Sequence, residues 1–272
     1  MSTTGKGSSR GHDARRILST LAELYAAPKS PKDLPSLGDL LEDDVSAFEY
    51  LVELQFFRGR RNKLSKQYFE CIKRAIEETG KKYGGRTMSV IKDQEDEIVA
   101  LYRQYVSEMR YKVNKNDERL IRGLVEVVRQ IPEAQGRRNV VAWATRSIEN
   151  GETWKLYYTL RGISEAGPKT VSLFIRDMVR LLGLESGLSP QDYGFVVPID
   201  IWVERAVKIL WPDVYKPADK EYLKWKLICE CLASDVSPIA VEKTLASIGQ
   251  DCKSAKEFEA KLINLGRGQP SS

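Results

Sequence analysis

Two side chains, Lys169 and Asp200, combine a reactive group with a position that suits chemistry. Lys169 follows Gly167 and Pro168 at the predicted start of a helix, and Asp200 stands 31 residues later at the predicted start of another. A deprotonated lysine amine attacks electrophilic carbons and forms Schiff bases. A carboxylate stabilises positive charge that develops on a reacting group. The plainer interpretations are a lysine that lies in a helix connection by chance and an aspartate that only caps its helix.

The remaining composition excludes several other kinds of chemistry. The one histidine, His12, lies close to the N-terminus, which argues against imidazole acid–base catalysis and histidine-ligated metals. The four cysteines contain no Cys-x-x-Cys pair, and we expect free thiols in a reducing compartment and no metal or other cofactor. The net charge of +5 permits a nucleic-acid partner without demanding one.

The apolar residues recur with helical spacing almost throughout, and no stretch alternates as a strand would, so the sequence predicts an all-α fold. Tyr193 to Pro198 is predicted to be a loop. The expected helices include 48–57, 63–79, 93–111, 117–131, 139–149 and 152–161, a helix after the Ser237-Pro238 start, and a last helix capped by Ser254. No apolar run is long enough for a membrane span, and the N-terminus has no signal-peptide core. We therefore expect an intracellular protein without a membrane partner.

The segment around Lys169 has the features of a phosphate-binding turn. A helix at 153–161 leads into Glu165-Ala166-Gly167-Pro168-Lys169-Thr170, and a second amphipathic helix follows. A tight turn exposes backbone N–H groups at a helix N-terminus, where the helix dipole favours an anion. Gly167 would allow close approach of a phosphate. We therefore expect Gly167, Pro168 and Thr170 to contact a phosphate backbone.

Together with the segment Val197-Pro198-Ile199-Asp200-Ile201-Trp202-Val203-Glu204-Arg205, this turn resembles the helix-hairpin-helix (HhH-GPD) DNA glycosylase superfamily. That family has the pattern G-x-G-x-K-T-A followed by V-D-x-H-V-x-R. Gly167, Lys169 and Thr170 match the first motif, and Asp200, Val203 and Arg205 match the second. The close match covers only about 40 residues of the chain.

The resemblance implies a bifunctional DNA glycosylase and AP lyase that acts in base excision repair. Lys169 would be the nucleophile, Asp200 would stabilise charge on the sugar, and Arg205 would belong to the DNA-binding surface. The implied fold has two helical lobes with a cleft between them, across which Lys169 and Asp200 would face each other. The expected boundaries are a loose tail at 1–12, a middle lobe at 48–185, a terminal lobe formed by 13–47 and 186–265, and a loose tail at 266–272.

The departures from the family pattern narrow the expected substrate. Glu165 replaces the first hairpin glycine and Trp202 replaces the histidine after the aspartate. The long spacing between Lys169 and Asp200 is most similar to the archaeal 8-oxoguanine glycosylase branch. The four-cysteine cluster motif of the thymine-glycol and adenine-mismatch branches is missing after Asp200. We expect a monomer that removes an oxidised base, first of all 8-oxoguanine, from double-stranded DNA. The alternatives are a glycosylase for oxidised pyrimidines or deaminated bases, and a non-catalytic DNA-binding protein.

Residues further upstream offer weaker indications of a DNA surface. Phe48 to Phe57 resembles the family helix that ends in a strand-inserting glutamine, which would give Gln55 that role, although an ordinary surface glutamine is equally compatible. The basic run from Arg58 to Lys66 is either a solvated helix face or a contact to the DNA backbone. Five tryptophans, namely Trp143, Trp154, Trp202, Trp211 and Trp225, are candidates for stacking on an everted base or for core packing.

Overall fold

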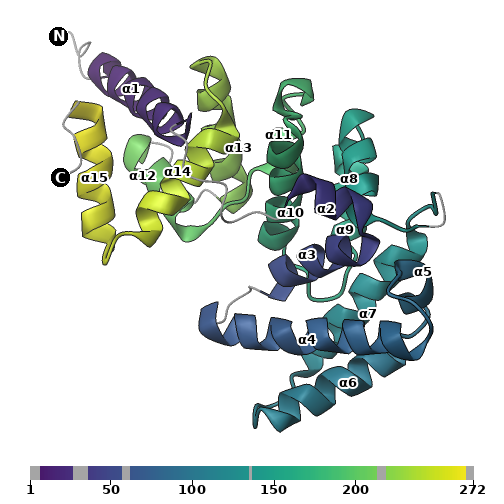
Figure 1. Ribbon diagram of the computed structural model, residues 1–272. Coiled ribbons are helices and arrows are strands. Elements are labelled where there is room, and N and C mark those ends of the chain that lie inside the picture. Colours follow the sequence, from purple (N-terminus) through teal and green to yellow (C-terminus); the bar gives the residue numbers. More distant parts are fainter. Residues whose placement is uncertain (1–6, 27–35, 57–61, 135–136, 213–218, 268–272) are drawn as a thin grey trace, which may run out of the picture. The chain divides into compact units, whose positions relative to one another are not determined.

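A computed structural model of the chain describes residues 7–26, 36–56, 62–134, 137–212 and 219–267 (Figure 1). Over these ranges the regular structure is helical and no strand forms, which confirms the all-α prediction. The chain divides into two compact units, which we call the middle unit (Lys32–Leu188) and the terminal unit (Met1–Pro31 with Ser189–Ser272).

The middle unit is built around α3, a helix that is apolar on most of its circumference and is therefore buried. The helix packs against α4, α8 and α10, and its side chains Phe48, Leu51 and Phe56 are almost completely shielded from solvent. The helices of this unit are α2 (Leu37–Glu42), α3 (Asp44–Phe56), α4 (Asn62–Lys82), α5 (Met88–Ile91), α6 (Glu95–Glu108), α7 (Lys115–Gln130), α8 (Val140–Glu149), α9 (Thr153–Arg161) and α10 (Pro168–Leu182), followed by a 3₁₀ turn at Glu185–Gly187.

The terminal unit joins the two ends of the chain, because α1 packs against α14 and α15 (Figure 1). Its helices are α1 (Gly7–Ala26), α11 (Tyr193–Val196), α12 (Ile201–Leu210), α13 (Lys220–Ala233), α14 (Pro238–Gln250) and α15 (Ala255–Arg267). Leu21, Val207 and Phe258 are completely buried at its centre. Each buried side chain of this size stabilises the fold by about 1.5–3 kcal/mol. The core thus holds α12, the helix that begins after Asp200, against the rest of the unit.

The boundary between the units differs from the prediction. Residues 36–47 were expected in the terminal lobe, yet they belong to the middle unit. The reason is that α2 packs on α3 and α8, and the Asn139 side chain donates a hydrogen bond to the Leu40 carbonyl at 2.7 Å. These contacts attach α2 to the middle unit. The sequence did not indicate this attachment, because Pro35 and Gly38 interrupt the helical pattern there.

Both stretches that were predicted to be loose tails are helical in part. The first helix begins at Gly7 and not near residue 13, because no proline between Gly7 and His12 prevents the helix from extending. At the other end α15 continues to Arg267 and buries Gly266. The loop prediction for Tyr193 to Pro198 is also wrong in part, since Tyr193–Val196 forms α11. The starts at Ser237 and Ser254 are confirmed, because the Ser237 hydroxyl accepts from Ala240 N–H and the Ser254 hydroxyl from Glu257 N–H.

Candidate functional site

The predicted hairpin forms as α9, a short turn and α10 (Figure 1). Ile163 and Ala166 anchor the turn because both side chains are buried. Within the turn, Ala166 N–H donates to the Ile163 carbonyl at 3.1 Å, and the Arg161 guanidinium donates to the Ala166 carbonyl. The turn is thus held by its own hydrogen bonds and by two apolar contacts, so it presents the start of α10 in a fixed conformation.

Lys169 is the second residue of α10 and its side chain is exposed. Pro168 occupies the first helical position, where its fixed φ angle suits the helix. Gly167 is the N-cap residue and gives the helix no side-chain cap. The positive end of the α10 dipole and the Lys169 ammonium group therefore lie together on the surface, an arrangement that suits an anion such as a phosphate.

Gly167 itself is not required by the fold. Its φ of −79° and ψ of 154° are open to any residue, and an added Cβ would meet only the Thr170 hydroxyl at 3.9 Å. The backbone strain of the turn lies instead at Glu165, whose φ is +69°. Glycine is the usual residue in that left-handed conformation. The position where the family pattern has its first glycine is therefore the one that needs a positive φ, although this chain fills it with glutamate.

A second glycine, which the sequence analysis did not single out, lies under the turn. Gly123 is in the middle of α7, and a Cβ at this position would lie 3.0 Å from the Ser164 nitrogen and 3.0 Å from Ile163 Cγ2. These contacts are closer than most real Cβ contacts, so a side chain here would require the turn or α7 to shift by a few tenths of an ångström. A glycine inside a strongly amphipathic helix is the only sequence signal that could have indicated this close approach.

Gln55 and Thr170 meet inside the middle unit. The Gln55 side chain is completely buried near the end of α3, and the Thr170 hydroxyl lies 2.6 Å from its Oε1 atom. Both interpretations of Gln55, as a strand-inserting residue and as an ordinary surface residue, placed it at the surface and do not fit this position. The hydrophobic surroundings of α3 explain the difference, because the helix is covered on most sides.

Asp200 is the N-cap of α12, so it caps its helix as the plainer interpretation predicted. Its Oδ1 atom accepts hydrogen bonds from Trp202 N–H at 2.8 Å and Val203 N–H at 2.9 Å, and the residue is half-buried. These bonds fix the direction of the carboxylate. An N-cap can serve a second purpose, because the same hydrogen bonds hold the carboxylate in one orientation.

Trp202 is partly buried and packs against the core of the terminal unit. It lies against Phe258, with ring centroids 5.1 Å apart, and directly over Gly249, where a Cβ would be 2.1 Å from its Cγ atom. Arg205 lies with its guanidinium carbon 4.8 Å from the centre of the same indole ring. Trp202 therefore anchors α12 to α14 and α15 and also positions Arg205.

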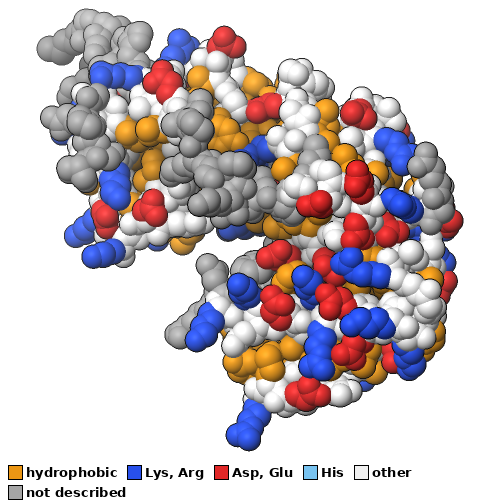
Figure 2. All heavy atoms as spheres, viewed as in Figure 1, with side chains coloured by type: hydrophobic (Ala, Val, Ile, Leu, Met, Phe, Trp, Pro, Cys, Tyr) orange, Lys and Arg blue, Asp and Glu red, His pale blue; other side chains and the backbone are white. Residues whose placement is uncertain are grey.

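The remaining candidates are distributed over both units. The terminal unit contains Asp200 and Arg205. The middle unit contains the other predicted site residues, namely Gln55, Gly167, Pro168, Lys169 and Thr170. Arg58 to Arg61 lie outside the described residues, and Lys63 and Lys66 lie in the first two turns of α4. Among the tryptophans, Trp154 on α9 and Trp225 on α13 are the more exposed, at 48% and 37%. Figure 2 shows acidic and basic side chains interspersed on the visible face of the middle unit.

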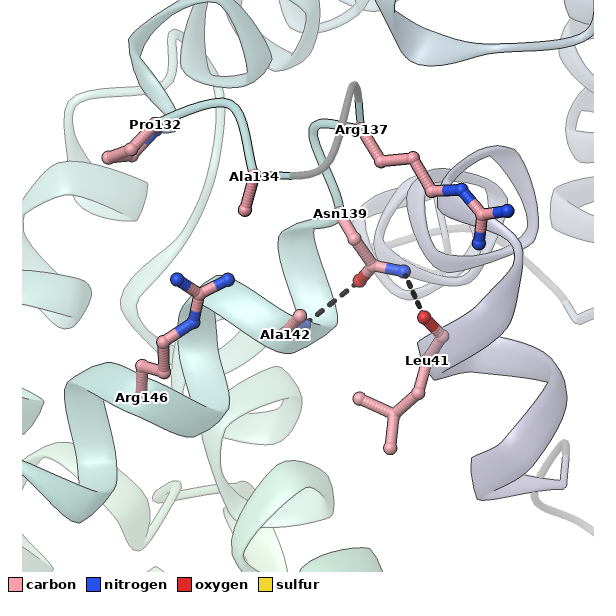
Figure 3. A pocket seen from close by; sticks show the side chains of 7 residues that line it. All are labelled: Leu41, Pro132, Ala134, Arg137, Asn139, Ala142 and Arg146. Carbon is pink, nitrogen blue, oxygen red and sulfur yellow. Dashed lines mark hydrogen bonds between the residues drawn. The ribbon is translucent and has the colours of Figure 1, made fainter.

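A pocket of about 330 Å³ lies at the start of α8 in the middle unit (Figure 3). Arg137 and Arg146 lie on opposite sides of it with Asn139 between them. Asn139 donates to the Leu41 carbonyl and accepts from Ala142 N–H, and Arg137 donates to the Glu42 carbonyl. The polar groups of the pocket are thus largely engaged in holding α2 against α8. None of the predicted site residues lines the pocket.

The described part of the chain contains no group of three histidine, cysteine, aspartate or glutamate residues that could hold a metal ion. No described helix is long and apolar enough to cross a membrane. All four cysteines, of which Cys71 and Cys231 are buried and Cys229 is exposed, are unpaired. In comparisons with known proteins, no family model, no curated protein and no solved structure matches this chain.

Proposed function

We propose that this chain is a bifunctional DNA glycosylase and AP lyase, a monomer that uses Lys169 as its nucleophile and needs no metal or other cofactor. The observation that carries the proposal is the exposed Lys169 in the first turn of α10, directly after a turn held by the Arg161–Ala166 hydrogen bond. A phosphate bound at this helix start would bring the sugar of the same nucleotide within reach of a side chain as long as lysine.

The Lys169 ammonium group must first give up a proton to solvent, because only the neutral amine is a nucleophile. The Lys169 Nζ atom attacks C1′ of the deoxyribose, and the bond from C1′ to the base breaks with its electron pair leaving on the base, which takes up a proton. The attached nitrogen loses a proton, the C1′–O4′ bond breaks and O4′ takes up a proton. The sugar ring is then open, with a protonated imine between Nζ and C1′. Loss of a proton from C2′ then expels the 3′ phosphate, with the electrons of the C3′–O bond, and the strand is cut.

Asp200 would supply negative charge while the C1′–base bond breaks, when the sugar becomes positively charged. The N-cap hydrogen bonds from Trp202 and Val203 suit this part, because a carboxylate that is already oriented costs no reorganisation during the reaction. The target base must leave the helix stack first, which is cheapest for a damaged or mispaired base. The preference for 8-oxoguanine rests only on the sequence resemblance.

Borohydride trapping tests the proposal, because hydride reduces the imine to a stable amine that links protein and DNA. The substrates are a duplex with one 8-oxoguanine, a duplex with one abasic site and an undamaged duplex. The variant is Lys169→Gln, and the matched control is Lys115→Gln, which changes an exposed lysine at the start of α7. We expect an adduct with the first two duplexes, lost in Lys169→Gln and retained in Lys115→Gln.

Other outcomes would select among the alternatives. Trapping only on the abasic duplex would retain the lyase and point to an oxidised pyrimidine or a deaminated base as substrate. Binding of DNA without any adduct would contradict the Schiff-base mechanism and favour a non-catalytic DNA-binding protein. In that case Lys169→Gln would cause only a modest, salt-dependent loss of affinity.

A further inference from the structure

The contact between Gln55 and Thr170 joins two segments that are far apart in the sequence. Gln55 lies near the C-terminal end of α3, and Thr170 is the third residue of α10. Their side chains approach to 2.6 Å, and both residues are buried. Thr170 is the residue after Lys169 in the same helical turn. A hydrogen bond from the Thr170 side chain therefore constrains the helical turn whose backbone carries Lys169.

The Thr170 hydroxyl has two acceptor oxygens within hydrogen-bond distance. Its oxygen lies 2.6 Å from Gln55 Oε1 and 3.0 Å from the Gly167 carbonyl. A hydroxyl has one proton, so it donates to one of these oxygens at a time. When the hydroxyl donates to Gln55, the bond ties α3 to the first turn of α10. When it donates to the Gly167 carbonyl, the bond stays within that turn.

The Gln55 amide is a costly residue for a purely structural position. Its Nε2 atom is buried and has no hydrogen-bond partner among the described residues. An unpaired buried polar group costs about 1–3 kcal/mol, and an apolar side chain of the same size would avoid that cost. Packing of α3 alone therefore does not explain a glutamine here, whereas a bond that orients the first turn of α10 does.

We infer that Gln55 is a positioning residue for Lys169, which acts through the Thr170 hydroxyl and not by contact with DNA. This inference rests on the proposed function. A nucleophile must be held close to its target atom and in line with it, and a displacement of about 1 Å can slow a reaction about 100-fold. Gln55 and Thr170 set the direction in which the Lys169 side chain leaves the helix.

The test compares two variants that remove the hydrogen bond from either side. Gln55→Met keeps the size of the side chain, and Thr170→Val keeps its shape. Thr170→Ser retains the hydroxyl, and Thr79→Val is the matched control, because Thr79 is completely buried in α4 and donates to the Ala75 carbonyl. The readouts are the single-turnover rate of trapping on an abasic duplex at saturating protein, the affinity for that duplex, and the midpoint of thermal unfolding.

We expect Gln55→Met and Thr170→Val each to slow trapping about tenfold or more, with DNA affinity changed less than the rate. The double variant should be no slower than the slower single variant, because both changes break one interaction. Thr170→Ser should restore most of the rate. Thr79→Val should lower stability and leave the rate unchanged at temperatures well below unfolding.

Two results would overturn the inference. One is an unchanged trapping rate in Gln55→Met, and the other is a double variant whose loss equals the product of the single losses. A Gln55→Met variant that fails only on the 8-oxoguanine duplex, where a base must be everted, would instead support insertion of Gln55 into DNA.

Hydrogen exchange separates this inference from the proposed function. If the unaltered protein forms no adduct with any duplex, the proposed function fails and Gln55 has no nucleophile to position. Amide exchange in residues 163–171 then still shows whether Gln55 holds the turn, since Gln55→Met should speed exchange there and Thr79→Val should not. Equal exchange in both variants would overturn the structural part of the inference as well.

Discussion

The carboxylate of Glu165 lies 3.3 Å from the guanidinium of Arg119, and this ion pair joins the hairpin turn to α7. Glu165 has a φ of +69°, a conformation that costs a residue with a side chain about 1–2 kcal/mol. The pair places a negative charge beside the helix start where a phosphate is expected. Arg119 partly compensates that charge, so the turn combines backbone strain with a local acid.

Glu165→Gly should therefore stabilise the protein by up to about 1 kcal/mol, because glycine adopts a positive φ without strain. The same change removes a negative charge and should increase the affinity for duplex DNA, most clearly at low salt. Denaturant unfolding and a salt series of binding measurements check the two effects. Glu165→Gln is the control, since it removes the charge and keeps the strain. A loss of stability in Glu165→Gly would contradict the strain argument.

Gly123→Ala should destabilise the middle unit by about 1–3 kcal/mol, because the added methyl group must displace the backbone at Ser164. Alanine is otherwise the better helix former, so helix propensity alone predicts a gain in stability. Gly38→Ala in α2 is the matched control, since a Cβ there meets only the Ser36 hydroxyl at 3.9 Å. Thermal unfolding of both variants decides between the two expectations. Trapping should also slow in Gly123→Ala alone.

Asp200→Asn distinguishes the capping role of Asp200 from the effect of its negative charge. Asparagine is an equally good N-cap, so the stability should change little, whereas the loss of charge should slow removal of the base about 100-fold or more. Asp200→Ala should also lose about 1 kcal/mol of stability. Asp219→Asn serves as the control, because Asp219 caps α13 through Tyr222 N–H at 2.7 Å. Equal rates in Asp200→Asn and the unaltered protein would leave Asp200 as a cap only.

The cysteines should differ strongly in their reactivity. Burial raises the pKa of the Cys71 thiol to about 11 and raises the pKa of Cys231 still further, so little reactive thiolate forms at either near pH 8. The exposed Cys229 should react first with a thiol reagent, while Cys71 and Cys231 should react only after unfolding. Mass spectrometry of the labelled peptides over time measures the order. Fast labelling of Cys231 in the folded protein would contradict its burial.

Local sequence signals were sufficient for most of the longer helices and for the placement of Lys169 at a helix start. Proline at the first helical position and glycine before it define the start of α10. An aspartate before an apolar-periodic segment predicts the N-cap of α12, which is also what forms. These features depend on neighbouring residues, and a single sequence contains that information.

The contacts between distant segments could not be predicted in this way. The burial of Gln55 depends on α4, α8 and α10 packing around α3, and the close approach of Gly123 to Ser164 depends on how α7 meets the hairpin. The attachment of α2 to the middle unit likewise follows from packing and from Asn139. Hydrophobic periodicity shows that a helix is covered on one or more faces, but it does not show which helix covers it.

The identity of the residue that becomes attached to DNA tests the central claim most directly. The protein is trapped with borohydride on an abasic duplex, digested, and the peptide that carries the nucleotide remnant is sequenced by mass spectrometry. We expect the modified residue to be Lys169, in the peptide that follows Arg161. Attachment at another lysine or at the N-terminal amine, with Lys169 unmodified, would contradict it.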